Sequence, residues 1–523
     1  MTEEASTVDL CVKEHDAIPS VYPSIVNRVI ASYQRNPNAT ALIIDGRSIS
    51  YSKLLSMAHA LALALKESPH KFCVLYIDNT LYRYIAMLAA WLADKTYIPI
   101  LPETSTSRCK SIVRQLPGAC YVLMSSYEER VKHLRGIIPT DSIVIAGPDL
   151  IGLDDQQEND AIKMVEGKNP YAVMIFTSGS TGAPKGVLIS HYNLSHYIEN
   201  ACHLFQPDET DVFAHCTSYA SDLHMHDFYV AWSVGAAVFV FADASRQRLP
   251  LEFKAYGITH CFMVPALAMR IQNDGFRIPN YLPDLKVCIF AGEPLTRTLA
   301  TFWARAANNS RIFNLYGPAE ATVAFTWHEW DARDQEELVP IGRALPGLDI
   351  HVFDTEGNEL PDGKKGELYL SGPQVVDGYY NNEDKTAAAF VKFSNGKVWY
   401  RSGDLGSIHQ DGVHFHGRID DCIKIKGYRI ERLDLETEIS LAVGAKRVAA
   451  VPFGGESFCQ DFALFVAPDD TLNIPEIKQQ CAAGLPDYMQ PTLVIIEPLP
   501  ANANGKIDYM ALNSRLEKLR KGG

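Results

Sequence analysis

Several features that define other protein classes are missing from this chain. Its 11 cysteines include no Cys-x-x-Cys pair, which disfavours structural zinc and a disulfide framework and predicts reduced core thiols. The longest apolar run, residues 231–242, is interrupted by Gly235 and is too short to span a membrane as a helix. The acidic start of the sequence lacks the cationic and apolar segments of a secretory signal. We therefore expect a cytoplasmic protein.

Positive charge is also scarce. Lys and Arg total 48 against 62 Asp and Glu, for a net charge of −14. This balance argues against a nucleic acid or an anionic membrane as the main partner. Any anionic substrate must then be met by local cations. No internal repeat or low-complexity segment is visible, and 523 residues are too many for one hydrophobic core, so at least two domains are expected.

Short apolar runs alternate with amphipathic stretches over about the first 400 residues. This texture predicts an α/β fold with several mostly parallel sheets. Near residue 340 the runs shorten and turn signals appear, which indicates a β-rich subdomain. The charged stretch 417–431 looks like a boundary, and the residues beyond it are enough for a small α+β domain.

One loop is rich in groups that bind phosphate. The segment 177–186 follows the apolar run 171–176 and precedes another, 187–189. Its glycines let backbone N–H groups form an anion nest, and its hydroxyls and lysine add donors and a cation. A flexible linker is disfavoured by the flanking apolar runs, and a Walker A loop by Pro184 before the lysine. The candidate phosphate-binding residues are Thr177, Ser178, Gly179, Ser180, Thr181, Gly182 and Lys185.

Three more segments carry candidate chemistry. In 314–320, Tyr316 offers a ring face to a base, Gly317 a tight turn and Glu320 a carboxylate for a hard cation. Asp404 follows a glycine, where it can accept hydrogen bonds from a ribose diol, although a simple turn aspartate has the same signature. Lys506, in Asn-Gly-Lys, alone would be taken for a surface lysine.

The order and spacing of these segments resemble the adenylate-forming superfamily, and within it the adenylation domains of non-ribosomal peptide synthetases and their free-standing relatives, including prolyl-carrier-protein ligases. The resemblance covers nearly the whole chain. Its segments are 49–54, 92–99, 177–186, 222–235, 314–320, 366–372, 400–405, 417–431 and 504–508.

The resemblance implies a two-step reaction. ATP and a carboxylic acid give an acyl-adenylate and pyrophosphate, and a phosphopantetheine thiol then takes the acyl group as a thioester. Lys506 would bridge the substrate carboxylate and the α-phosphate as the catalytic residue. Asp404 and Arg418 would hold the ribose and Glu320 Mg²⁺. The family positions around the adenine are Tyr316, Phe415, Gly292, Glu293 and Asn314.

The family also implies a mobile C-terminal domain. Its hinge aspartate corresponds to Asp420, which divides the chain into an adenylation core, 1–419, and a mobile domain with the catalytic lysine, 420–523. Lys506 has to leave the site before a pantetheine arm can reach the adenylate.

The class of acid depends on one aspartate. Asp222 lies thirteen residues before Gly235, the spacing at which amino-acid-activating relatives place the carboxylate that pairs with the substrate ammonium. Asp227 is the rival. Two departures stand out: Ser221 where the family usually has an aromatic residue, and Ala319 where it commonly has threonine.

The remaining side-chain pocket is carried over by position. Its members are mostly apolar: Leu223, His226, Ala266, Ile289, Ala291, Leu315, Val323 and Ala324. Part of this set is similar to the pockets of proline-activating relatives, whereas His226 and Ala266 differ from that pattern. Proline or a proline-like imino acid is the first expectation and a small aliphatic amino acid the second. His226 has two interpretations: a polar contact for a substituted substrate, or a core histidine satisfied by Asp227 or a carbonyl.

The chain has no room for a carrier domain after Lys506 and no His-His-x-x-x-Asp-Gly condensation motif. We expect a monomer acting on a separate carrier protein. An acyl- or aryl-CoA ligase of the same superfamily is the nearer alternative, and a non-catalytic nucleotide-binding protein the farther one.

Overall fold

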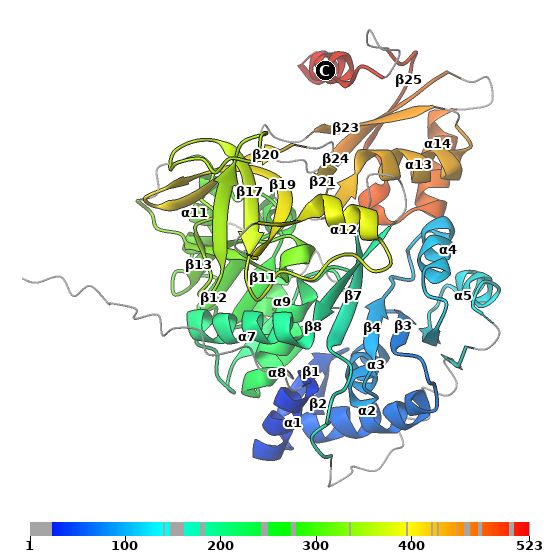
Figure 1. Cartoon of the computed structure of the whole chain (residues 1–523), viewed down its shortest axis with the longest axis vertical. Helices are drawn as coiled ribbons and strands as arrows, with labels where there is room; N and C mark the ends of the chain where they lie inside the picture. The colour runs from blue at the N-terminus through cyan, green and yellow to red at the C-terminus, as the bar shows by residue number, and fades with distance from the viewer. Residues whose placement is uncertain are drawn as a thin grey trace, which may run out of the picture.

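The computed structural model describes residues 24–139, 142–146, 162–177, 184–241, 249–273, 279–333, 336–393, 396–419, 422–425, 428–445, 447–453, 461–468, 473–500 and 507–521. Two large sheets lie beside each other in the lower part of Figure 1, and the C-terminal elements lie above them.

The larger sheet is parallel through its middle and antiparallel at both edges. Its strand order is β15-β14-β13-β12-β11-β9-β10-β1-β2. The strands are β1 (Thr40–Ile44), β2 (Arg47–Ser50), β9 (Val212–His215), β10 (Ala237–Val240), β11 (His260–Met263), β12 (Val287–Phe290), β13 (Arg311–Tyr316), β14 (Thr326–Glu329) and β15 (Arg343–Ala344). The central strands β10, β11 and β12 are buried along their whole length, as expected for parallel strands covered on both faces.

The smaller sheet has the order β6-β5-β3-β4-β7-β8 and is parallel except for the β7–β8 hairpin. Its strands are β3 (Phe72–Ile77), β4 (Thr96–Pro99), β5 (Ala119–Met124), β6 (Val144–Ala146), β7 (Tyr171–Thr177) and β8 (Lys185–Ser190). Parallel strands need crossover connections, and helices supply most of them.

The helices of this part are α1 (Val26–Arg35), α2 (Tyr51–Lys66), α3 (Leu81–Leu92), α4 (Thr106–Arg114), α5 (Glu128–Arg135), α7 (His191–Phe205), α8 (Ala231–Val234), α9 (Leu249–Ala255), α10 (Pro265–Asn273) and α11 (Arg297–Ala306), with a π-helical turn η2 (His226–Val230) and a 3₁₀ turn η4 (Ala319–Ala321). Helix α3 is buried on almost every side. Its Trp91 donates to the carbonyl of Ala172 on β7, and its ring lies 4.5 Å from that of Tyr229. Helix α3 therefore packs between the smaller sheet and η2.

A β-rich subdomain follows, as the sequence predicted. It consists of β16 (Asp349–Phe353), β17 (Gly366–Ser371), β18 (Phe390–Lys392), β19 (Val398–His409) and β20 (Gly412–Arg418), with helix α12 (Glu383–Ala389). Strands β19 and β20 form a long antiparallel pair in which Asp404 lies opposite Arg418.

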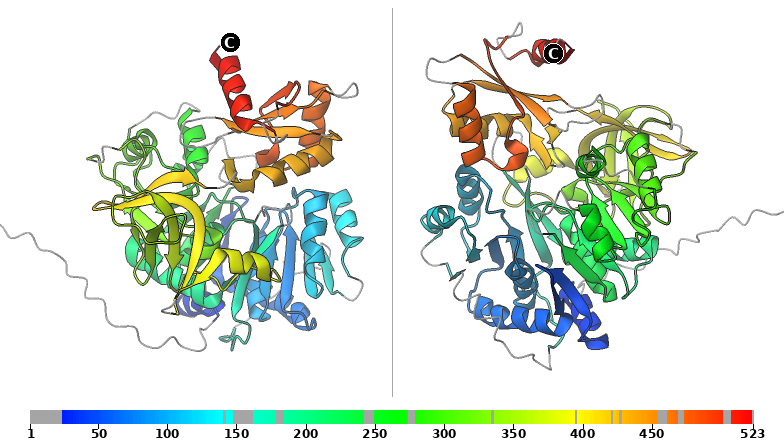
Figure 2. Two further views of the ribbon diagram at one scale, coloured as in Figure 1. Left: turned by 45° about the horizontal axis from the view of Figure 1, so that its top comes forward. Right: turned by 180° about the vertical axis from the view of Figure 1, so that it is seen from behind.

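The C-terminal elements have hydrophobic clusters of their own. They are the hairpin β21 (Cys422–Ile425) and β22 (Tyr428–Glu431), strands β23 (Val448–Phe453), β24 (Asp461–Val466) and β25 (Leu493–Ile496), helices α13 (Arg432–Val443), α14 (Ile474–Gly484) and α15 (Tyr509–Lys521), and the 3₁₀ turn η5 (Asp487–Met489). Because side chains alternate along a strand, the sheet β23-β24-β25 has two faces. One packs on the hairpin, α13 and α14, and the other on α15 and Ile507 (Figure 2).

The predicted α/β class with mostly parallel sheets is confirmed. The eight cysteines whose side chains are described are free thiols. Among the described helices, none has both the length and the apolar character needed to cross a membrane.

Candidate active site

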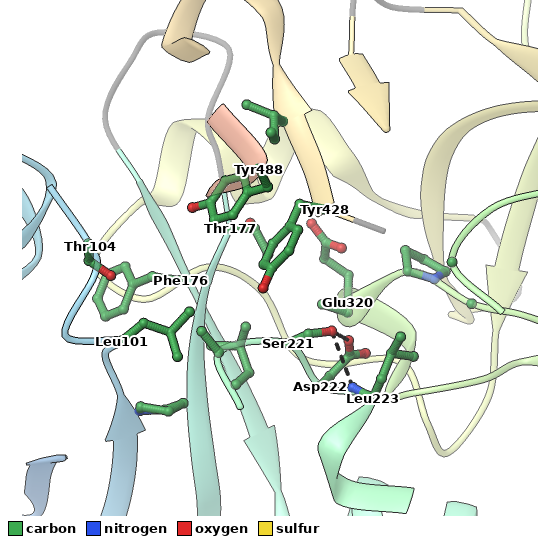
Figure 3. Close-up of a pocket in the computed structure, with 18 of the residues that line it drawn as sticks. Leu101, Thr104, Phe176, Thr177, Ser221, Asp222, Leu223, Glu320, Tyr428 and Tyr488 are labelled. Carbon is green, nitrogen blue, oxygen red and sulfur yellow. Dashed lines mark hydrogen bonds between the residues drawn. The ribbon is translucent and has the colours of Figure 1, made fainter. Parts of the chain in front are cut away.

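A cavity of about 160 Å³ lies where strands of both large sheets end. In open α/β sheets, ligands bind beyond the carboxyl ends of parallel strands. Thr177 ends β7, Ile100 follows β4, Gly292 follows β12, and Tyr316 ends β13; all four line this cavity. Figure 3 shows its wall.

Two glycines at the wall have steric reasons to be glycine. Gly292 has a φ of +86°, a conformation that side chains with a Cβ disfavour. At Gly317 a Cβ would come within 2.8 Å of the Cα of Ala324. Gly292 thus allows a sharp turn after β12, and Gly317 allows the backbone after β13 to pass close to that of Ala324.

Asp222 is a buried carboxylate in this wall. Its Oδ2 accepts from the backbone N–H of Val323 at 3.0 Å, and its Oδ1 accepts from the hydroxyl of Ser221 at 3.3 Å. Both of these hydrogen-bond donors, the partners of Asp222 among the described residues, are uncharged. Burial raises the pKa of Asp222 to about 6, although the Val323 N–H opposes the shift. A cationic group of a ligand would relieve this desolvated charge.

Position 221 holds serine where the resemblance led us to expect an aromatic residue. This serine provides a hydroxyl that donates a hydrogen bond directly to Asp222. The Ser221 carbonyl is also held: His224 Nδ1 lies within hydrogen-bond distance of it, and His224 Nε2 lies 2.7 Å from the hydroxyl of Tyr97 on β4. The loop that carries Asp222 is therefore tied to the smaller sheet.

A second carboxylate, Asp404, lies at the wall with two partners. The hydroxyl of Tyr316 donates to its Oδ2 at 2.7 Å, and Arg418 donates to its Oδ1. Burial, with the Asp404 charge beside it, raises the pKa of Tyr316 well above its ordinary value. The Phe415 ring lies 6.4 Å from the Tyr316 ring. The residues predicted to hold a ribose and a base are therefore adjacent.

Glu320 is a third buried carboxylate of the wall, and Tyr379 connects it to Lys185 of the phosphate loop. Its Oε1 accepts from the Tyr379 hydroxyl at 2.8 Å, and Lys185 Nζ lies 4.7 Å from the centre of the Tyr379 ring. The buried hydroxyl of Thr177 has no hydrogen-bond partner among the described residues. Both Thr177 and Glu320 line the cavity, so a hydrogen-bond donor and a carboxylate face the same space.

The carboxylate of Glu320 is a suitable protein ligand for Mg²⁺ if phosphates and water supply the remaining ligands. Within the described part of the chain, no cluster of three or more His, Cys, Asp or Glu side chains could hold a metal alone. Mg²⁺ in nucleotide sites is commonly bound through one or two protein carboxylates together with phosphates and water. Glu320 would be the protein carboxylate of such a site.

Two residues predicted along the adenine edge have their side chains committed elsewhere. Asn314 donates to the carbonyls of Val339 and Pro340. The Glu293 carboxylate accepts from the N–H of Ala266 at 2.8 Å. Neither is among the residues that line the cavity as described. Their side chains fix the loops around the site.

The expected side-chain pocket is reproduced only in part. Asp222 and Leu223 line the cavity. Five others are buried in the main hydrophobic core, which Leu223 also joins: Ile289, Ala291, Leu315, Val323 and Ala324. Ala266 is half-buried on α10.

His226 is a core histidine in this structure. Its Nδ1 lies 2.7 Å from the Tyr197 hydroxyl, and its ring contacts those of Phe205 and Phe262. Burial lowers its pKa to about 3. The described hydrogen-bond partner of His226 is thus Tyr197 and not Asp227, and His226 is not among the residues that line the described cavity. A contact between His226 and the substrate stays a prediction.

Asp227 was the alternative to Asp222 for the contact with the substrate ammonium. Its carboxylate forms hydrogen bonds with His215 and Thr217. It is also absent from the described cavity wall, which favours Asp222 as the substrate contact.

Several wall residues were not expected from the sequence. Arg108 on α4 adds a cation, and its guanidinium donates to the Phe176 carbonyl at 3.3 Å. From the C-terminal elements come Tyr428, Ile430, Tyr488 and Met489. The rings of Tyr428 and Tyr488 stack at 3.8 Å and lie over the cavity in Figure 3. Tyr428 falls within the boundary motif, but Tyr488 had no sequence signal.

The C-terminal elements are held over the cavity by polar contacts. The hydroxyls of Ser105 and Ser107 each donate to Glu438 Oε2 at 2.6 Å, and Arg130 donates to the Ala483 carbonyl at 3.2 Å. Ile507 packs on the opposite face of the sheet β23-β24-β25. Several predicted site residues lie outside the described residues: Ser178, Gly179, Ser180, Thr181, Gly182, Asp420 and Lys506.

Chemically, the wall combines two cations, Arg108 and Arg418, with three buried carboxylates. Such a site can bind a polyanion through its cations and a metal, while Asp222 is left to bind a positive group.

The family described as AMP-binding enzyme matches residues 30–380 of this chain. An L-proline–[L-prolyl-carrier protein] ligase of Pseudomonas fluorescens is 30% identical over 508 residues, which cover 94% of this chain and 99% of that protein. The chain belongs to the family of AMP-binding ligases.

Some similar proteins are much longer than this chain. Bacitracin synthase 2 of Bacillus licheniformis is 26% identical over 525 residues, which cover 98% of this chain but only 19% of that synthase. Among solved structures, the Vibrio cholerae adenylation domain AlmE, in complex with glycyl-adenosine-5′-phosphate, has a TM-score of 0.85 and 26% identity, covering 97% of this chain and all of that one. The fold is therefore that of an adenylation domain.

Proposed function

We propose that this protein activates an α-amino acid with ATP, releases pyrophosphate, and transfers the aminoacyl group to the phosphopantetheine thiol of a separate carrier protein. The observation that carries the proposal is the desolvated Asp222 carboxylate, whose partners among the described residues are neutral. An amino acid brings the missing ammonium, whereas a fatty or aryl acid would leave the buried charge unpaired.

The nucleotide is held by the residues around the cavity. The Asp404 carboxylate accepts hydrogen bonds from the ribose hydroxyls, and Arg418 donates to its Oδ1. The rings of Tyr316 and Phe415 flank the base. Thr177, Lys185 and the intervening loop take the β- and γ-phosphates. Glu320 would hold Mg²⁺, which would neutralise phosphate charge when bound. This assignment is supported by the cavity wall that Thr177, Tyr316, Glu320, Asp404 and Arg418 share and by the hydrogen bond from Tyr316 to Asp404.

In the first step a substrate carboxylate oxygen attacks the α-phosphorus, and the bond to the β-phosphate oxygen breaks as pyrophosphate leaves. Asp222 fixes the amino end of the substrate, so the carboxylate is positioned for in-line attack. Arg108 and Lys506 stabilise the negative charge that gathers around the phosphate.

We further propose that the chain works as two units, 1–419 and 420–523, that reorient about Asp420 between the steps. In support, Tyr428 and Tyr488 of the second unit line the cavity together with residues of the first, and the second unit has hydrophobic clusters of its own. In the second step the thiol replaces AMP. A monomer suffices for both steps.

Proline or a proline-like imino acid is the proposed substrate. Support comes from the prolyl-carrier protein ligase, which matches along its whole length, and from the apolar residues that share one hydrophobic cluster with Leu223. Because His226 is buried away from the cavity, it gives no reason to favour a substituted proline. The glycyl-adenylate of the AlmE complex keeps a small amino acid as the second candidate.

The test is ATP–pyrophosphate exchange by the purified protein with each of the common amino acids, hydroxyproline, pipecolate, azetidine-2-carboxylate, and a few aryl and fatty acids. A strong response to one amino or imino acid supports the proposal. Exchange only with acids that lack an amine would move the protein to the CoA-ligase class.

A further inference from the structure

The segment that donates to Asp222 has an unusual backbone. Thr322 and Val323 have φ values of +57° and +66°. For β-branched residues this left-handed conformation is a genuine outlier and persists only where the surroundings enforce it. The turn is what aims the Val323 N–H at Asp222 Oδ2. Something must hold it there.

Gln374, which follows β17, is that constraint. Its side chain is fully buried. Its amide nitrogen has two N–H groups, which it shares among three carbonyl oxygens: Ala324 at 2.6 Å, Thr322 at 3.2 Å and Ala321 at 3.3 Å. Since carbonyls only accept, the nitrogen has to face the turn, and Oε1 then lies 3.1 Å from His196 Nδ1.

The backbone around Gln374 adds two more bonds. The Thr322 hydroxyl donates to the Gln374 carbonyl at 2.7 Å, and the N–H of Val376 donates to the Glu320 carbonyl at 3.0 Å. Segment 320–324 is thus tied to 374–376 at both ends. One buried side chain fixes the turn between the predicted metal carboxylate, Glu320, and the amide that meets Asp222.

We propose that Gln374 is a positioning residue for substrate recognition: by enforcing the Thr322–Val323 turn, it keeps the Asp222 carboxylate aimed at the substrate ammonium. The inference rests on the proposed function. Gln374 itself does not line the described cavity, so its effect reaches the substrate only through the turn and Asp222.

The test variant is Gln374→Met, which keeps the length of the side chain and removes its donors. Without the Val323 N–H in place, the ionised form of Asp222 loses a hydrogen bond, which raises its pKa. In ATP–pyrophosphate exchange we expect the KM for the amino acid to rise about tenfold, while kcat and the KM for ATP change less than threefold. The acid limb of kcat/KM should also move to higher pH.

The matched control is Thr326→Val on β14. Its buried hydroxyl donates to the Ile341 carbonyl at 2.6 Å, so the variant also leaves a buried carbonyl without its donor. It should reduce stability without changing the amino-acid KM or the acid limb. Should Gln374→Met fail to fold, Thr322→Val, which removes one bond to Gln374, should show the same two effects at smaller size.

The inference is overturned if both the amino-acid KM and the acid limb stay at wild-type values in a folded variant. It is overturned equally if the KM values for ATP and amino acid rise together. Wild-type protein that shows no exchange with any amino acid would instead refute the proposed function.

Discussion

Replacing Asp222 with asparagine removes the charge of the proposed ammonium contact and little else. The asparagine oxygen can still accept from the Val323 N–H, so the local turn keeps its bond. A buried charge pair that loses one partner typically costs 3–5 kcal/mol, or roughly 150- to 4,000-fold in an equilibrium. We expect kcat/KM for the amino acid to fall toward the lower end of that range, since the amide oxygen still accepts one hydrogen bond from the ammonium.

The assay is ATP–pyrophosphate exchange with amino acid and ATP varied separately. Asp227→Asn is the matched control, because Asp227 is equally buried but bonds to His215 and Thr217. The control should alter stability while sparing the amino-acid KM. Undiminished kcat/KM in Asp222→Asn would refute the ion-pair argument, and so would an equal loss in the control.

Three further outcomes are expected. The pKa of Asp222 is raised to about 6, so the carboxyl is protonated and unable to pair with an ammonium below that pH; kcat/KM for the amino acid should drop about tenfold per pH unit there, and persistence of this limb in Asp222→Asn would contradict its assignment. Removing Arg418 leaves the buried Asp404 without its cation, so Arg418→Ala should lower the free energy of unfolding in urea by about 3 kcal/mol, and Arg418→Ala/Asp404→Asn should recover part of the loss; a less stable double variant would argue against the ion pair. Lys506→Ala should abolish adenylate formation yet still transfer the aminoacyl group from supplied adenylate to a carrier protein, whereas equal loss of both steps would exclude the two-unit mechanism.

The sequence predicted best what depends on local order along the chain. Alternating apolar strands and helices define parallel sheets, and residues that follow those strands must meet at one edge. Thr177, Gly292 and Tyr316 do meet there, because each lies at or just beyond the end of a strand.

Contacts that depend on how distant elements pack together could not be predicted from the sequence. Tyr488 reaches the cavity only because η5 packs beside the β21–β22 hairpin, where it stacks on Tyr428. The spacing of His226 left two interpretations open because it is the same whether η2 presents the side chain to the cavity or to Tyr197, its described partner. Gln374 went unnoticed since its role depends on three carbonyls about fifty residues earlier.

Whether Asp222 selects acids that carry an ammonium can be decided with one pair of substrates. Exchange should be measured with the preferred amino acid and with the same acid lacking its amine, for example proline against cyclopentanecarboxylic acid. We expect strong exchange with the amino acid and a kcat/KM lower by at least about 100-fold for its amine-free analogue. Comparable exchange with both would show that Asp222 does not read the ammonium.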